Sequence, residues 1–197
     1  MIIVISSPSG GGKTTIAKKL LEIFPTFKIS PSFTTRTQRE GLGEGKYRFV
    51  LKEKFEDMIV KAELIEWASV FGNYYGTPRA EFDSLLNEGS DILLDIDVDG
   101  AEAIKALYPE AILIFLTPPS ILELKKRLVE RKRDSEKELI ERLKRAEMEI
   151  KRSENYDYRV VNDDIEKTIF MIKEIIEKEK RSAISVKQKY RRKRDVV

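Results

Sequence analysis

The segment Ser7–Thr14 constrains this chain more than any other feature of its sequence. It reads Ser-Pro-Ser-Gly-Gly-Gly-Lys-Thr and matches the phosphate-loop pattern G-x-x-x-x-G-K-[ST] except at its first position, where Ser7 replaces glycine. The short apolar run Ile2–Ser6 precedes the segment, and helical spacing of apolar residues follows it over Thr14–Phe24. A strand, a glycine-rich loop and a helix in this order are the context in which the pattern binds phosphate.

The chemistry of this loop predicts a nucleoside triphosphate as its ligand. Glycines let the backbone amides turn inward around oxyanions, at the positive end of the following helix. We expect Lys13 to reach the β- and γ-phosphates and the Thr14 hydroxyl to bind Mg²⁺. The residues expected to contact ATP in this segment are Ser9, Gly10, Gly11, Gly12, Lys13, Thr14 and Thr15.

Asp95 is the second candidate for binding Mg²⁺. It lies in the apolar run Ile92–Ile96, where a carboxylate is costly unless a cation pairs with it. A hydrated magnesium ion beside the loop is the expected partner. The alternative, an aspartate that caps the next helix, fits Asp99 better. If the strand continues, Asp97 points to the same side as Asp95.

The remaining pattern predicts an α/β fold. Residues 92–96, 111–116 and 159–161 are apolar on both faces, as parallel strands covered by helices are. Helical patterns alternate with them at 79–88, 100–107, 120–132, 137–154 and 164–182. The sequence therefore predicts a three-layer P-loop fold with a parallel central sheet, and 197 residues suit one such domain. Residues 32–78 differ, because glycines interrupt their aromatic and β-branched runs, which indicates a small inserted sheet.

Composition excludes several kinds of chemistry. The chain has no cysteine and no histidine, so disulfides, thiolates and imidazole bases play no part. The start of the sequence lacks the features of a signal peptide, and no apolar run is long enough for a membrane span. A net charge of +3 is too small to imply nucleic acid. We therefore expect a cytoplasmic protein with neither a membrane nor a nucleic-acid partner.

Five further motifs accompany the phosphate loop. They are Ser-Phe-Thr-Thr-Arg-Thr-Gln-Arg at 32–39, Gly-Lys-Tyr-Arg-Phe at 45–49, Ile-Glu-Trp at 65–67, Gly-Asn-Tyr-Tyr-Gly-Thr at 72–77 and Leu-Asp-Ile-Asp at 94–97. In this order, from about Ile2 to Asp164, the series closely resembles the guanylate kinases. The resemblance implies a kinase of purine nucleotide metabolism with ATP as co-substrate, Mg²⁺ as cofactor, and GMP or dGMP as acceptor.

The resemblance also implies which residues bind the acceptor. Arg36 and Arg39 would clamp its phosphate, since guanidinium groups bind phosphate bidentately. Tyr47 and Tyr75 would donate hydroxyl groups to the same phosphate. The other residues that the resemblance assigns to the acceptor would contact the base or lie on the nucleotide side of the cleft. They are Ser32, Glu66, Thr77 and Asp97.

Glu66 would decide the choice of base. Its carboxylate would accept hydrogen bonds from guanine N1–H and the 2-amino group. Adenine has an acceptor at N1 and no 2-amino group, so it would leave the carboxylate unpaired. Ser32 and Thr77 would meet guanine O6 or nearby edge atoms, and Thr77 keeps the hydroxyl of the family's usual serine.

A helical lid is implied over residues 127–142. Arg127 would help bind ATP, while Arg131 and Arg142 would join Lys13 and the two acceptor arginines as catalytic groups. Lys132 replaces a usual glycine at the lid hinge, and Asp99 replaces a usual glutamine. The expected division is a core of 1–31, 79–126 and 143–183, a GMP-binding region of 32–78, this lid, and a basic tail of 184–197, which we expect to be a solvated terminus.

Two alternatives stay open. One is a P-loop kinase for another acceptor, which Glu66 argues against. The other is a non-catalytic binding module of guanylate-kinase type, although such domains typically lose the loop lysine or the acceptor contacts that this chain retains. The sequence leaves the oligomeric state undetermined.

Overall fold

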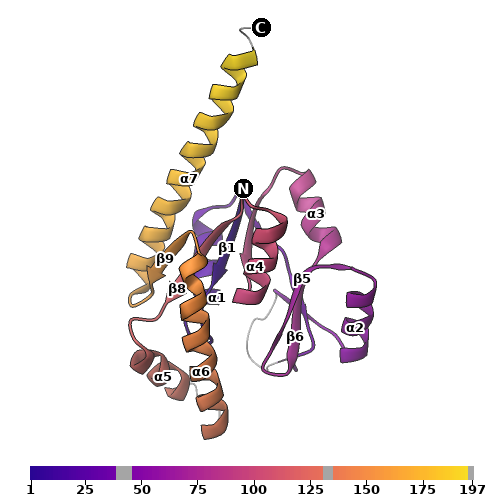
Figure 1. The fold of residues 1–197 in the computed structure, drawn as a ribbon, viewed down its shortest axis with the longest axis vertical. Coiled ribbons are helices and arrows are strands. Elements are labelled where there is room, and N and C mark those ends of the chain that lie inside the picture. Colours follow the sequence, from indigo (N-terminus) through magenta and orange to yellow (C-terminus); the bar gives the residue numbers. More distant parts are fainter. Residues whose placement is uncertain (39–45, 131–134, 195–197) are drawn as a thin grey trace.

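The computed structural model describes residues 1–38, 46–130 and 135–194, with side chains described up to residue 182 (Figure 1). Its centre is a parallel sheet in the order β2-β7-β1-β8-β9. The strands are β1 (Ile2–Ser6), β2 (Phe27–Ile29), β7 (Asp91–Asp95), β8 (Ile112–Thr117) and β9 (Tyr158–Val161). Every residue of β1 is buried, which explains why this strand is apolar on both faces.

Helices cover both faces of the central sheet. On one face, α1 (Lys13–Ile23) and α7 (Ile165–Arg194) pack on the strands through apolar residues such as Ile16, Leu20 and Ile172. On the other, α3 (Arg79–Asn87) and α4 (Val98–Leu107) do so through Phe82 and Ile104. The predicted three-layer fold with a parallel sheet is confirmed.

A second, smaller sheet lies beside the first, as expected from the composition of residues 32–78. Its order is β4-β3-β6-β5, formed by β3 (Ser32–Thr34), β4 (Tyr47–Phe49), β5 (Leu64–Val70) and β6 (Asn73–Pro78). Helix α2 (Lys52–Val60) packs on it through Phe55 and Met58, which share a separate small core with Leu64. The Trp67 ring, 45% exposed, meets Tyr74 edge-on. Figure 1 shows this region to one side of the central sheet.

Two helices border the loop that follows β1. They are α5 (Ile121–Glu130) and α6 (Glu136–Arg152), which pack together through Leu124, Leu128 and Ala146 and are followed by the short η1 (Ser153–Asn155). Gly10 adopts a φ of +93°, and a Cβ atom there would lie 3.0 Å from the Leu128 side chain. Gly10 therefore allows both the turn of the loop and its close packing on α5.

The structure differs from the sequence-based expectation in four places. The short strand β2 and the helix α2 were not predicted, because three residues show no period and the apolar residues of α2 lie among aromatic and β-branched runs. Helix α7 runs to Arg194 instead of ending near residue 182. The residue that caps α4 is Asp97, whose side chain accepts from the Gly100 amide, and not Asp99, which lies inside the helix.

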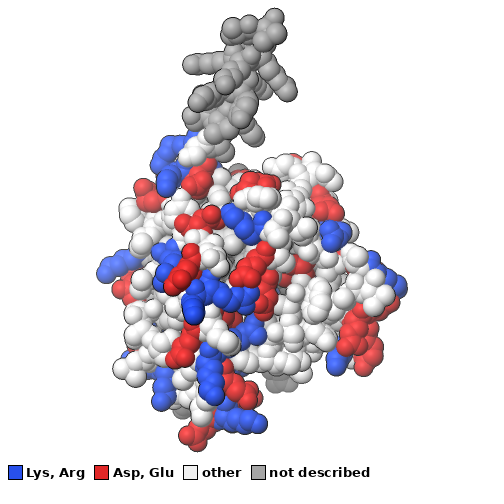
Figure 2. All heavy atoms as spheres, in the orientation of Figure 1, with Lys and Arg blue, Asp and Glu red and all other residues white. Residues whose placement is uncertain are grey.

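Charged side chains of both signs are interspersed over the face drawn in Figure 2. Within the part of the chain that the structure describes, no helix is long and apolar enough to cross a membrane.

Candidate active site

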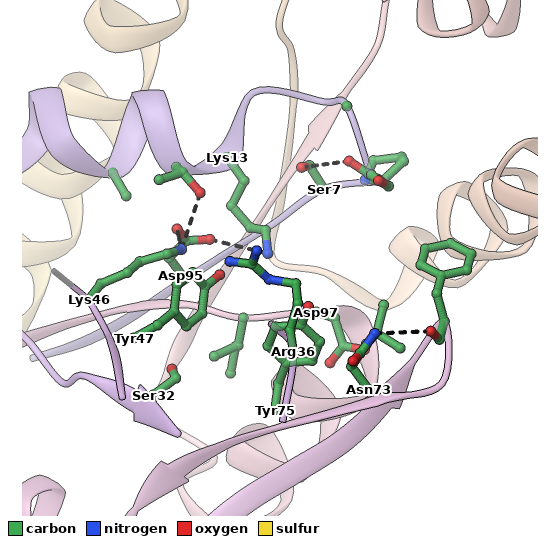
Figure 3. Close-up of a pocket in the computed structure, with 18 of the residues that line it drawn as sticks. Ser7, Lys13, Ser32, Arg36, Lys46, Tyr47, Asn73, Tyr75, Asp95 and Asp97 are labelled. Atoms are coloured by element: carbon green, nitrogen blue, oxygen red, sulfur yellow. Dashed lines mark hydrogen bonds and ion pairs between the residues drawn. The ribbon is translucent and has the colours of Figure 1, made fainter. Parts of the chain in front are cut away.

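A cavity of about 1190 Å³ lies between the loop after β1 and the small sheet. Figure 3 shows side chains from both sides pointing into it. The predicted site residues that line the cavity are Ser9, Gly10, Gly12, Lys13, Thr14, Thr15, Ser32, Arg36, Tyr47, Glu66, Tyr75, Asp95, Asp97 and Arg142. The fold thus brings together motifs that are up to 133 residues apart in the sequence.

The backbone of the glycine-rich loop turns tightly between β1 and α1. The Gly11 amide donates to the Pro8 carbonyl oxygen at 2.8 Å, and Gly12 precedes α1 with a φ of +91°. Among the described non-glycine residues, positive φ occurs at Ala62 and Phe71, so Ser7 needs no glycine-like conformation. Its buried hydroxyl donates to the Pro8 carbonyl oxygen at 3.0 Å. The departure at Ser7 therefore leaves the loop geometry intact.

Asn162 holds this loop from behind. Its Nδ2 donates to the Gly11 carbonyl oxygen at 2.7 Å, and its Oδ1 accepts from the Thr168 hydroxyl at 3.0 Å. A Cβ atom on Gly12 would lie 2.5 Å from Asn162 Nδ2. Arg127 contacts the same asparagine, since its Nη1 donates to the Asn162 carbonyl oxygen at 3.0 Å. Gly11 and Arg127 consequently do not line the cavity.

Two lysines converge on Asp95 (Figure 3). Lys13 Nζ lies 3.2 Å from Asp95 Oδ1, and Lys46 Nζ forms an ion pair with Asp95 Oδ2. Although burial opposes the charge of this carboxylate, the two ammonium groups lower its pKa to about 2. Burial likewise opposes the charge of Lys13, yet Asp95 holds the pKa of Lys13 above its ordinary value. Lys13 and Asp95 are therefore both charged near neutral pH.

The same oxygens suit a hard divalent cation. Lys46 Nζ also donates to Thr14 Oγ1 at 3.1 Å, so one ammonium group bridges the hydroxyl and carboxylate predicted to bind Mg²⁺. Asp95 Oδ1 is buried and accepts no hydrogen bond from the described residues. Within these residues no cluster of three acidic side chains could hold a metal, which fits a site completed by phosphate and water. The described residues that pair with Asp95 are Lys13 and Lys46, and the hydrated cation expected at this carboxylate stays a prediction.

Arg36 and two tyrosines form the opposite wall. The Arg36 guanidinium carbon lies 5.5 Å from the Tyr47 ring centroid, and the Tyr47 and Tyr75 rings meet edge-on at 6.0 Å. Ser32 pairs with Tyr47 in the parallel register of β3 and β4, which brings its hydroxyl to the same wall. One guanidinium and several hydroxyl groups suit a phosphate ester. Arg39 lies outside the described residues.

Glu66 is buried at the end of the cavity on β5, with 5% of its surface exposed. Burial, together with the charge of Asp97, raises the pKa of Glu66 to about 7, against hydrogen bonding from Thr77. The buried Thr77 hydroxyl donates to Glu66 Oε1, so Thr77 supports this carboxylate and does not line the cavity itself. A Cβ atom on Gly100 would lie 2.4 Å from Glu66 Oε2, so glycine leaves room for the carboxylate.

Helix α6 brings arginines to both halves of the site. Arg142 Nη1 donates to Ser9 Oγ at 2.7 Å, and the Arg142 guanidinium lies 4.5 Å from the Phe71 ring centroid. Arg145 joins Asp97 at 2.9 Å, Glu149 at 2.8 Å and the Ser69 carbonyl oxygen at 3.2 Å. Arg131 and Lys132, which were expected in the lid, lie outside the described residues.

Sequence reasoning missed four contributors to this site: Lys46, Phe71, Arg145 and Asn162. Lys46 lies inside the recognised motif at 45–49 and Phe71 directly precedes the motif at 72–77, so their position beside Tyr47 and Gly72 was an available signal. Arg145 lies one helical turn after Arg142, on the same face of α6. Asn162 follows the apolar run 159–161 and belongs to none of the recognised motifs. The cap of the helix that follows it is Asp164, whose Oδ1 accepts from the Lys167 amide at 2.8 Å.

A glycine-rich loop at the end of a buried parallel strand, with Lys13 and Asp95 facing a wall of one guanidinium and two tyrosine side chains, defines a P-loop nucleotide-binding protein. The family model described as "Guanylate kinase" matches residues 1–179. Guanylate kinases of Clostridioides difficile and Clostridium tetani are each 45% identical to this chain over 181 residues, covering 91% of this chain and 88% and 86% of the relatives. The crystal structure of guanylate kinase from Anaplasma phagocytophilum is similar with a TM-score of 0.75 and 40% identity, covering 91% of this chain and 85% of that one. The chain belongs to the guanylate kinase family.

Proposed function

We propose that this protein transfers the γ-phosphoryl group of ATP to GMP, and to dGMP, giving ADP and the corresponding diphosphate. One observation carries the proposal: a single cavity joins the phosphate loop to a buried carboxylate, Glu66, and to an anion-binding wall. The relatives with 45% identity are named guanylate kinase, which supports the same reaction here.

Glu66 selects the base. Its carboxylate accepts from guanine N1–H and the 2-amino group, while Thr77 fixes the carboxylate through its own hydrogen bond. Ser32 lies nearby to meet a guanine edge atom. Because adenine would leave a buried carboxylate unpaired, discrimination at such a site reaches about 10⁴-fold.

The acceptor phosphate binds to Arg36, Tyr47 and Tyr75, with Arg39 completing the clamp. The family resemblance assigns Arg39 this role, and Arg36 supports it by already facing the cavity beside Tyr47. The positive charge of the arginines offsets repulsion between the two nucleotides, each of which carries negative phosphates.

The reaction needs no strong base. The second pKa of a phosphate monoester is about 6, so the GMP phosphate is largely dianionic at neutral pH. One of its oxygens attacks the γ-phosphorus, the bond from this phosphorus to the β,γ-bridging oxygen breaks, and ADP leaves with the electron pair. This explains how catalysis proceeds in a chain without histidine.

Charge stabilisation supplies the rate. Lys13 neutralises the β- and γ-phosphates, and Arg142, with Arg131 of the lid, stabilises the transferring group. The loop amides of Ser9, Gly10 and Gly12 cradle the triphosphate with Thr15. Gly11 holds the shape of the loop through its bonds to Pro8 and Asn162, and Arg127 supports the ATP side through Asn162. Thr14 and Asp95 would hold Mg²⁺, which would draw charge from the β- and γ-phosphates when bound.

A comparison of acceptors tests the proposal. Turnover with ATP is measured for AMP, GMP, dGMP, UMP, CMP and dTMP in a coupled assay of ADP release. We expect GMP and dGMP to exceed the others by at least about 10³-fold in kcat/KM. Preference for another acceptor would indicate a different P-loop kinase. Absence of turnover with all six would favour the binding module.

The Lys13→Ala variant tests the phosphate loop itself. Loss of this ammonium removes the main counter-charge at the β- and γ-phosphates, so we expect kcat to fall by about 10² or more. Full turnover in this variant would refute the assignment of the ATP site.

A further inference from the structure

Lys46 belongs to residues 32–78, the acceptor region, but reaches into the ATP half of the site. It immediately precedes β4, and its carbonyl oxygen accepts from the Ser32 amide at 2.8 Å, which anchors its backbone to β3. Its side chain is only 14% exposed. Its ammonium group ends between Thr14 Oγ1 and Asp95 Oδ2 (Figure 3).

These two oxygens are the ones that the proposed function assigns to Mg²⁺. Mg²⁺ and the Lys46 ammonium group would each lie against Thr14 and Asp95. The two cations cannot occupy this position at the same time. Either cation places a positive charge next to the buried Asp95 carboxylate and so offsets the cost of burying it. The protein alone therefore already contains a substitute for the metal.

Asp95 does not need Lys46 once another cation is present. Lys13 already lies 3.2 Å from Asp95 Oδ1, so one ammonium group balances the single negative charge of the carboxylate. Lys46 has a flexible four-carbon stem, and its Nζ lies 4.7 Å from the centroid of the Tyr47 ring. The ring offers the ammonium group a second favourable contact on the acceptor side.

We propose that Lys46 is an internal counter-cation that holds the metal position on Thr14 and Asp95 and leaves it when the metal–nucleotide complex binds. This inference rests on the proposed function, because that function assigns the metal to these oxygens. A group that fills the site for about nine-tenths of the time lowers the apparent affinity of its competitor about tenfold.

Calorimetric titration with ADP tests the inference. The dissociation constant of ADP is measured with Mg²⁺ and again with EDTA, and the ratio of the two values gives the gain in affinity due to the metal. In Lys46→Met, which keeps the length of the stem and removes the charge, we expect this gain to increase about tenfold. In Lys46→Arg, which keeps a cation, we expect a gain much closer to that of the wild type.

Lys52→Met is the matched control. Lys52 lies in the same region on α2, its side chain is 64% exposed, and it contacts only Glu56 among the ion pairs described. Its metal-dependent gain should equal that of the wild type. Thermal unfolding of each variant verifies that the fold is retained.

An unchanged or smaller gain in folded Lys46→Met would overturn the inference. The measurement contains no GMP and does not depend on turnover. Failure of the acceptor comparison would therefore refute the proposed function, whereas failure of this titration would refute only the role of Lys46.

Discussion

Glu66 is an acidic side chain held in surroundings that oppose its charge. Burial raises its pKa to about 7, so near neutral pH the protein alone holds a mixture of the carboxylate and its acid. Under the proposed function guanine donates to this group, so it would bind the carboxylate better than the acid. At the scale of one residue, the choice of base and the response to pH have the same origin.

We expect the affinity for GMP to fall as the pH decreases below 7. Above its pKa Glu66 is ionised and the affinity is constant. Below it, the proton must be released before guanine binds, so the dissociation constant increases about tenfold per pH unit. Titration of GMP into the protein by calorimetry between pH 5.5 and 8.5 measures this change.

Glu66→Gln is the control, because it cannot titrate. This variant should bind GMP more weakly, and its affinity should retain only the pH dependence that arises from the GMP phosphate, which titrates near pH 6. An identical profile in wild type and variant would contradict the role of Glu66.

The phosphate loop is an element whose shape depends on a distant one. Asn162, which follows β9, donates to the Gly11 carbonyl oxygen and lies against Gly12. Thr168 on α7 in turn donates to Asn162. The loop is therefore supported by the end of β9 and the first turns of α7, on the side away from the cavity.

Asn162→Ala should loosen this support. A buried carbonyl group that loses its donor costs about 1–3 kcal/mol. We therefore expect the free energy of unfolding, measured in urea, to decrease by this amount. We also expect the KM for ATP to increase about tenfold while the KM for GMP changes little. Glu166→Ala, which removes only the exposed pair with Lys19, should leave both KM values unchanged. Equal increases in the two KM values would contradict a local effect on the loop.

Prediction from sequence succeeded where a local pattern determines the structure. The apolar run of β1, the glycine-rich loop and the buried β7 and β8 are such patterns. It failed where partners are distant, since Lys46 and Asp95 are 49 residues apart and Asn162 and Gly11 are 151 apart. Helix α2 was missed because its two buried residues, Phe55 and Met58, face a small core that only the folded region creates.

At the scale of the whole molecule, α6 connects the two sheets. Arg145 reaches Asp97 after β7 and the Ser69 carbonyl oxygen on β5, and it also pairs with Glu149 on its own helix. Burial raises the pKa of both Asp97 and Glu149. A single guanidinium group thus offsets two partly desolvated carboxylates at the junction of the central sheet and the acceptor region.

Arg145→Met should destabilise the protein more at high pH than at low pH. Removing the guanidinium leaves two buried carboxylates uncompensated, which costs about 3 kcal/mol when they are ionised. Both pKa values are already raised, so protonation relieves this cost as the pH decreases through them. Urea unfolding at pH 8 and pH 5 measures the difference.

Arg152→Met on the same helix is the matched control. Its partners Asp99 and Glu102 are more than one-third exposed. We therefore expect the free energy of unfolding to decrease by less than about 1 kcal/mol at either pH. Similar losses for the two variants would contradict the proposed connection.

Trp67 on β5 is the single tryptophan of the chain. It follows Glu66 directly, is partly exposed and touches the Tyr74 ring. Its emission therefore originates from the acceptor region alone, without a background from the central sheet. Excitation of this indole would allow a fluorimeter to follow guanine entering the cavity, or the small sheet unfolding by itself, with no dye attached.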